Sequence, residues 1–223
     1  MAAYDLEEQE QLDELKTWWK MHGNLVTAVV VAAAIGVVGW QGWNWWQRSQ
    51  ATQASQLYGA LQTAAAQQDA KRAREVAGEL IDKYARTTYA GLAALLSAKV
   101  QADGGDMKSA EAQLAWAADN AQGDGVRDLA RLRLAALLID DKAYDEALKR
   151  LAGEPTSALA PRFAETRGDA LAAQGKAADA RAAYEVALAA VDAVIKDGGS
   201  EARTQIPYRE LLQAKLDALG SGK

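Results

Sequence analysis

The chain has 223 residues, a formal net charge of −5 at pH 7 and no cysteine. A protein without a basic excess lacks the electrostatic surface that binds nucleic acid, so we predict no nucleic-acid partner. The missing cysteine excludes disulfides and thiol nucleophiles, and the single histidine, His22, is too little for a catalytic triad or a histidine metal site. We therefore predict a protein that is not an enzyme, with no catalytic or metal site and no cofactor.

Residues 1–23 form an acidic tail that we predict to be helical. Six acidic residues and two lysines lie in this segment, so it holds most of the net negative charge. Leu12, Leu15 and Trp19 share one face of such a helix, and the other face is acidic. We expect the apolar face to lie at a membrane interface or against a partner. The negative charge of the tail argues against anionic lipid as its main attraction.

An apolar segment follows, with no Asp, Glu, Lys or Arg between Lys20 and Arg48. As an α-helix its apolar run, residues 25–46, would reach about 33 Å, enough for a hydrocarbon core of about 30 Å. We therefore predict one transmembrane helix over residues 24–47, in contact with the lipid bilayer. Tryptophan side chains prefer the boundary between lipid and water. The tryptophans at the two ends of the run are Trp18, Trp19, Trp40, Trp43, Trp45 and Trp46.

We predict that this segment is a retained anchor and not a cleaved signal peptide, because a long acidic tail precedes it and tryptophans end it. Two lysines before the span and only Arg48 directly after it favour a cytoplasmic N-terminus and a C-terminal domain on the other side. Within the span, Ala28, Ala32 and Gly36 recur every four residues and could form a flat face for another transmembrane helix. A composition rich in small residues would produce the same spacing.

Residues 48–223 are predicted to form one all-α domain, because they are rich in alanine and turn residues interrupt them at nearly regular intervals. Residues 162–190 fit a tetratricopeptide repeat, which is a pair of antiparallel helices. Small residues at positions 168 and 180 would let the two helices approach, and Tyr184 would fill the groove against the next pair. The packing positions of this unit are Gly168, Gly175, Ala180, Tyr184 and Ala187.

Two further units and a weaker fourth, centred on Ala73, repeat this pattern. Their equivalent small residues are Ala98 and Ala110 in one unit and Ala135 and Ala147 in the other. The residues that open the second helices, at positions 73, 110, 147 and 180, are 37, 37 and 33 residues apart. We predict a tetratricopeptide-like α-solenoid of about four helix pairs, with Lys142 in place of a turn glycine and a short helix before Pro155. Pro207 is predicted to start a final helix that caps the solenoid.

The first helix of each pair lines the concave face of such a solenoid, so charged residues on these helices are candidate contacts for a polypeptide. The candidates are Lys99, Asp103, Arg162, Glu165 and Asp169. The alternative interpretation is that they are ordinary solvated charges on helix surfaces.

Four segments occur in an order that resembles one bacterial family. They are the acidic start YDLEEQEQLDELKTWWKMHGNL, the span ending in GWQGWNWW, and the repeat segments LRLAALLIDDKAYDEAL and RGDALAAQGKAADARAAYEVAL. Together they resemble the YfgM-type family of Gram-negative bacteria, over nearly the whole chain. The resemblance implies a single-pass inner-membrane protein with a periplasmic repeat domain. It also implies an ancillary partner of the SecYEG translocon that works with a membrane-anchored periplasmic chaperone.

The resemblance implies that the protein binds other proteins and catalyses no reaction. Its concave surface would bind the chaperone, or unfolded client polypeptides as they emerge from the translocon. Two other hypotheses use the same anchor and repeats. One is a scaffold for another envelope assembly or secretion system, which crosslinks that never reach the translocon would favour. The other is a signalling adaptor, either facing the cytoplasm or restraining an envelope stress regulator.

Overall fold

The computed structural model describes residues 2–199 and 202–220, with side chains from residue 12 onward. All the regular structure in these residues is α-helix, in nine helices. The chain divides into two compact units, Met1–Gln50 and Ala51–Lys223. This division lies three residues after the predicted boundary between residues 47 and 48.

The helix α1 (Ala2–Ala66) runs through the tail, the apolar segment and the start of the second unit. No proline interrupts its 65 residues, and its alanines and leucines are strong helix formers. Neither predicted boundary, at residue 23 or at residue 47, is therefore a helix end. The helix ends at Ala66, just before the turn signal that begins at Gln67.

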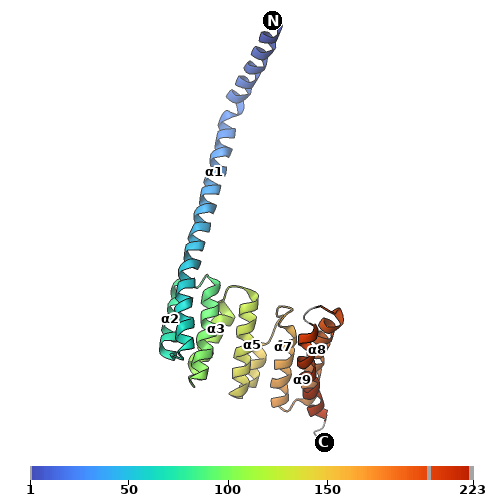
Figure 1. Cartoon of the computed structure of the whole chain (residues 1–223). Helices are drawn as coiled ribbons and strands as arrows, with labels where there is room; N and C mark the ends of the chain where they lie inside the picture. The colour runs from blue at the N-terminus through green and yellow to red at the C-terminus, as the bar shows by residue number, and fades with distance from the viewer. Residues whose placement is uncertain (1, 200–201, 221–223) are drawn as a thin grey trace. The chain divides into compact units, whose positions relative to one another are not determined.

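The second unit is a row of helical pairs, and Figure 1 shows its helices standing side by side. After the last part of α1, its helices are α2 (Ala70–Tyr84), α3 (Thr88–Asp103), α4 (Met107–Asn120), α5 (Asp124–Asp140), α6 (Tyr144–Arg150), α7 (Ala160–Ala173), α8 (Ala177–Asp197) and α9 (Ala202–Gly220). The end of α1 pairs with α2, α3 with α4, α5 with α6, and α7 with α8. These four pairs and the final helix confirm the predicted all-α solenoid.

The four pairs share one turn geometry. Gln68, Gly105, Lys142 and Gly175 have positive φ angles of 55°, 83°, 62° and 78°. At each turn this residue donates its N–H to the carbonyl three residues earlier, and the next residue donates to the carbonyl five residues before itself. This is the Schellman arrangement, which satisfies the last carbonyls of a helix with a left-handed residue after its end. The predicted replacement of a turn glycine by Lys142 is thus confirmed.

Alanine fills the contacts inside the pairs, as the repeat pattern predicts. Ala73, Ala110, Ala147 and Ala180 are fully buried. The remaining alanines predicted as packing positions, Ala98, Ala135 and Ala187, are also buried. Because these side chains are small, the two helices of each pair can lie close together.

Tyr184 packs differently from the prediction. Its ring lies against Gly168 of its own pair, since a Cβ placed on that glycine would be 2.5 Å from Tyr184 Cε1. Leu216 of α9 belongs to the same small buried cluster as this ring. Gly168 therefore makes room for an aromatic ring inside the pair, and Tyr184 joins the pair to the final helix.

The helix α6 has only seven residues, as the position of Pro155 predicts. The segment that follows is held by Asp128 of α5, a carboxylate that is only 3% exposed. Asp128 Oδ2 accepts a hydrogen bond from the backbone N–H of Thr156 at 2.8 Å. The short helix is thus followed by a loop that a buried acid fixes to the neighbouring repeat.

The prediction that Pro207 starts the final helix is wrong. α9 already includes Ala202, and Pro207 lies inside it. A proline removes one hydrogen bond to the carbonyl four residues earlier, which here belongs to Arg203. Both residues are exposed, so water can solvate the freed carbonyl, and the loss falls near the start of the helix where few such bonds exist.

Candidate functional site

The apolar segment of α1 has no protein around it in its own unit. Val38 and Ile35 are 70% and 68% exposed, and the other large apolar side chains of the segment are exposed as well, except that of Val26, which is half-buried. Among the described residues, this is the one helix that is long and apolar enough to cross a membrane. Such a continuous exposed apolar surface is unfavourable in water, because apolar area transfers readily into hydrocarbon.

The six tryptophans predicted at the membrane interface are all exposed. Their exposed fractions range from 40% at Trp46 to 73% at Trp45. Trp43 and Trp46 pack against each other, with ring centroids 5.3 Å apart. Indoles in this arrangement present both an apolar ring and an N–H donor, which suits the headgroup boundary.

The predicted helix-packing face of Ala28, Ala32 and Gly36 is also exposed. A Cβ placed on Gly36 would meet no atom within 4 Å, so the surface there is flat and open. Its use as a contact for another transmembrane helix stays a prediction.

Of the candidate concave-face residues, Lys99 and Asp103 remain accessible. They form an ion pair one turn apart on α3, with side chains 63% and 59% exposed. The half-buried Leu92 and Leu96 lie on the same face of this helix. The solvent side of α3 therefore has an apolar patch next to an ion pair that carries no net charge.

Glu165 does not project onto an open face, because α9 covers it. It is only 6% exposed, and its Oε2 accepts hydrogen bonds from the Tyr208 hydroxyl at 2.8 Å and from Arg162 Nη1 at 3.1 Å. Lys215 Nζ donates to its Oε1 at 2.8 Å. The Arg162 guanidinium lies over the Tyr208 ring, 3.7 Å from the centroid, which is a cation–π contact.

Asp169 belongs to the same cluster. Lys215 Nζ lies 2.7 Å from its Oδ1 and 2.8 Å from its Oδ2, and the Tyr184 hydroxyl donates to Oδ1 at 2.7 Å. We call Arg162, Glu165, Asp169, Tyr184, Tyr208 and Lys215 the α9 ion cluster. Its carboxylates are engaged inside the chain, so they are not free contacts for a partner.

The cluster shifts the pKa values of its members. Burial alone would raise the pKa of Glu165, but hydrogen bonds from Lys215 and Tyr208 outweigh it, so this pKa lies below the ordinary value. Burial opposes the charge on Lys215, yet hydrogen bonds to Asp169 and Glu165 raise its pKa. Burial and a hydrogen bond to Glu165 raise the pKa of Tyr208. Each group is therefore held in the protonation state that binds α9.

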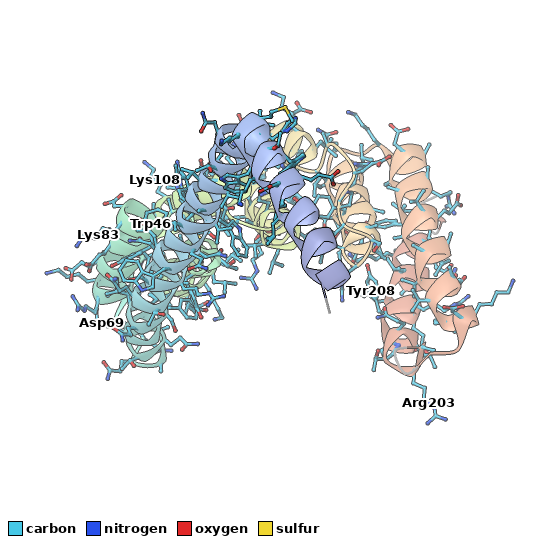
Figure 2. All side chains as sticks on the ribbon, turned by 90° about the horizontal axis from the view of Figure 1, so that it is seen from above. Trp46, Asp69, Lys83, Lys108, Arg203 and Tyr208 are labelled. Carbon is cyan, nitrogen blue, oxygen red and sulfur yellow. The ribbon has the colours of Figure 1, made fainter. Side chains whose placement is uncertain are left out.

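Lys215 and Tyr208 are not among the residues predicted from the sequence, because the final helix is predicted only as a cap of the solenoid. Tyr208, Leu212 and Lys215 are four and three residues apart and so share one helix face. Figure 2 shows Tyr208 on the side of α9 toward the neighbouring helices, whereas Arg203 points away from them. Leu212 and Leu216 are buried, but Leu211 is 46% exposed. The helical spacing alone places Tyr208 and Lys215 on the buried face, but it does not show which carboxylates they meet.

The described residues contain no group of three or more His, Asp and Glu side chains placed to hold a metal ion. The second unit also contains no nucleophile paired with a histidine, since the single histidine, His22, belongs to α1. The features that remain are a membrane-type helix and a helical-repeat surface.

Comparison with known proteins identifies the class of protein to which this chain belongs. A family model described as a tetratricopeptide repeat-like domain matches residues 16–221. A Neisseria gonorrhoeae protein named ancillary SecYEG translocon subunit is 32% identical over 220 residues, covering 98% of this chain and 100% of that protein. Haemophilus influenzae and Escherichia coli proteins of the same name are 31% and 28% identical, over 83% and 84% of this chain and 90% of each relative.

The fold and these matches define a tetratricopeptide repeat-like protein with an apolar N-terminal helix. The chain belongs to the YfgM-type family, whose curated members carry the name ancillary SecYEG translocon subunit.

Proposed function

We propose that this protein is an ancillary subunit of the SecYEG translocon, anchored in the inner membrane by residues 24–47, with its N-terminus in the cytoplasm and its repeat domain in the periplasm. There the solenoid binds a membrane-anchored chaperone, emerging polypeptides, or both. The observation that carries the proposal is the joining of an exposed membrane-type helix to a repeat scaffold in a chain that is similar to one translocon subunit over 98% of its length.

A short connection supports a role at the membrane. Only residues 47–53 separate Trp46, at the end of the span, from Ala54, the first buried residue of the solenoid. Even fully extended, this segment reaches no more than about 30 Å. A tethered domain has a high effective concentration for whatever emerges beside it, so modest affinity is enough for capture.

The accessible side of α3 supports polypeptide binding on the second helical pair. The α9 ion cluster engages the candidate charged residues of α7, which leaves α3, with Leu92, Leu96, Lys99 and Asp103, as a place for a partner. Half-buried leucines beside a balanced ion pair suit apolar segments of a polypeptide better than a strongly charged ligand.

In vivo photocrosslinking tests this assignment. We expect a probe at Ala32 to reach a translocon subunit and a probe at Lys99 to reach a chaperone or a nascent chain. A probe at Lys149, exposed on the second helix of its pair, is the matched control and should give neither product. Crosslinks only to another envelope assembly, or to a stress regulator, would overturn the translocon assignment.

The orientation has its own test. A reporter enzyme fused after Lys223 should be active only if its chemistry matches the periplasm. Activity confined to a cytoplasmic reporter would reverse the topology and remove the solenoid from the translocon exit.

A further inference from the structure

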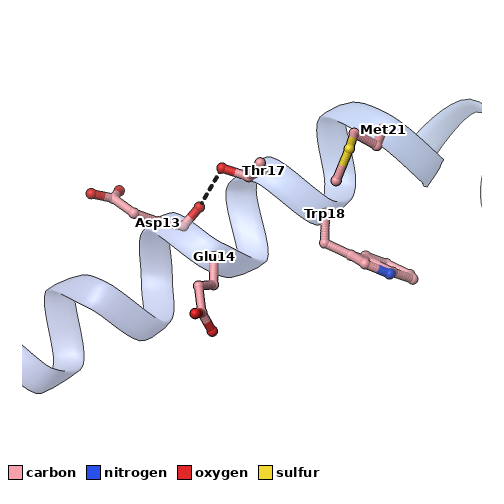
Figure 3. A pocket seen from close by; sticks show the side chains of 5 residues that line it. All are labelled: Asp13, Glu14, Thr17, Trp18 and Met21. Carbon is pink, nitrogen blue, oxygen red and sulfur yellow. Dashed lines mark hydrogen bonds between the residues drawn. The ribbon is translucent and has the colours of Figure 1, made fainter.

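Two hollows on different faces of α1 lie directly before the span. One is apolar and is lined by Leu15, Lys16, Trp18, Trp19 and Lys20. We call it the lysine hollow. The other is lined by Asp13, Glu14, Thr17, Trp18 and Met21, and Figure 3 shows its two carboxylates pointing outward from the helix. The tail is acidic as a whole, but its charged side chains line different hollows. The two lysines line the apolar hollow, and the two carboxylates line the other one.

The lysines of this hollow are available to a ligand. Lys16 forms an ion pair with Asp13 at 3.0 Å, and the two side chains are 70% and 75% exposed. A pair this exposed contributes little to stability, so an anion can compete for the ammonium. Lys20 is one helical turn further toward the span, on the same side of α1. Glu14 lies on the other face, in the second hollow.

The wall of the hollow is shaped by Trp19. A Cβ placed on Gly23 would lie 3.1 Å from Trp19 Nε1, so the indole lies along the helix against that glycine. Leu15 is 61% exposed and Trp19 54% exposed, and together they give an apolar strip beside the two lysines. Glycine at position 23 thus keeps the indole flat and the hollow open.

The position along the chain indicates the ligand. The predicted span starts four residues after Lys20, about 6 Å along a helix, which is the depth of lipid headgroups. A phosphate there faces ammonium groups, and the acyl chains below it lie against apolar side chains. Anionic lipid attracts basic groups close to the membrane surface. Glu14 lines the other hollow, and the Asp13 carboxylate forms the exposed ion pair with Lys16 that a phosphate would replace.

We propose that the lysine hollow binds one phospholipid with an anionic headgroup. Lys16 and Lys20 contact its phosphate, and the Trp19 indole, which lies against Gly23 on the side of the span, contacts its upper acyl chain. The proposal rests on the anchoring of residues 24–47 in a membrane. It refines the expectation for the tail, since anionic lipid is attracted to one face and not to the tail as a whole.

Lipid titration of the purified full-length chain in neutral detergent tests the site. The probes are phosphatidylglycerol and phosphatidylcholine with the same acyl chains, and native mass spectrometry measures the fraction of chains carrying one lipid. Two lysines predict a preference for phosphatidylglycerol on the order of tenfold at low salt, weakening as salt is added. The double variant Lys16→Gln/Lys20→Gln should bind both lipids within about twofold of each other.

The matched control is Lys108→Gln/Lys149→Gln, which removes two exposed lysines of the solenoid and should keep the preference. Equal binding of the two lipids by the unchanged protein, or a preference that survives in Lys16→Gln/Lys20→Gln, overturns the lipid site. Membrane fractionation and co-purification with SecYEG are measured on the same variants. A chain that stays with the translocon but lacks the preference refutes only this site, whereas a chain absent from membranes refutes the anchoring itself.

Discussion

At the scale of single residues, the four left-handed turn positions show how the repeat tolerates departures from its pattern. Gly105 and Gly175 adopt the positive φ without a steric penalty, whereas Gln68 and Lys142 adopt it with a side chain present. The hydrogen bonds of the turn are the same in all four pairs. The tertiary packing of the pair therefore imposes the backbone conformation even where the residue disfavours it.

Lys142→Gly should raise the free energy of unfolding by roughly 0.5–1 kcal/mol. The glycine removes the strain of a left-handed residue with a Cβ, and the greater entropy of glycine in the unfolded chain offsets part of that gain. Chemical denaturation followed by circular dichroism measures the change. Lys142→Ala keeps the Cβ and serves as control, so an equal gain in that variant would show that the lysine side chain, and not the backbone, is the cause.

Ser97→Ala should also stabilise the protein, by about 1 kcal/mol. Ser97 is fully buried in α3, and its Oγ has no hydrogen-bond partner among the described residues. Burying a hydroxyl without a partner costs free energy, and alanine is the better helix former. Thermal unfolding of the two proteins compares them. A lower midpoint in Ser97→Ala would mean that the hydroxyl has a partner in solution.

At the scale of helices, the sequence predicts this fold because local residue patterns mark where the helices of each repeat begin and end. Small residues at a fixed spacing, a turn residue five positions earlier and no competing strand pattern identify the pairs. The final helix has no such template, and its polar contacts depend on residues about 40 to 50 positions away in the chain. Helical periodicity cannot predict which buried carboxylate a lysine will meet. The α9 ion cluster therefore needed the structure, and so did the helix start before Pro207.

Lys215→Met should destabilise the protein by about 1–3 kcal/mol, because it leaves Glu165 buried without its ammonium partner. The expected loss of stability is smaller than for a fully buried ion pair because the Lys215 side chain is 26% exposed to solvent. Lys196→Met on the exposed side of α8 is the charge-matched control and should change little. Adding Glu165→Gln should return part of the loss, which a double-mutant cycle measures. Additive effects would argue against direct coupling.

The same cluster predicts an acid dependence. The folded-state pKa of Glu165 lies below its ordinary value of 4.5, so its contribution to stability is present above that value and is lost as the pH falls through the folded-state pKa. Unfolding free energies measured between about pH 6 and pH 3 should therefore fall more steeply for the natural chain than for Glu165→Gln. Parallel slopes would contradict the assigned role of this carboxylate.

At the scale of the whole molecule, the last part of α1 belongs to the solenoid, although the same helix contains the apolar segment. Ala54, Leu61 and Ala64 are buried against α2 and α3, in one cluster with Val76 and Leu80. No repeat of a solenoid buries its apolar face alone, so the first pair needs this segment. The apolar segment and the first helix of the solenoid are thus parts of one helix, and the boundary that matters for folding lies before residue 54.

Two truncations test this boundary. A chain of residues 51–223 should be soluble without detergent and fully helical, because it keeps the whole first pair and loses the exposed apolar segment. A chain of residues 67–223 should be less stable by on the order of 5 kcal/mol, since Val76 and Leu80 lose the cover of Leu61. Circular dichroism, denaturation and sedimentation compare the two chains. Equal stability would show that the solenoid begins at α2 and that α1 serves only as the anchor.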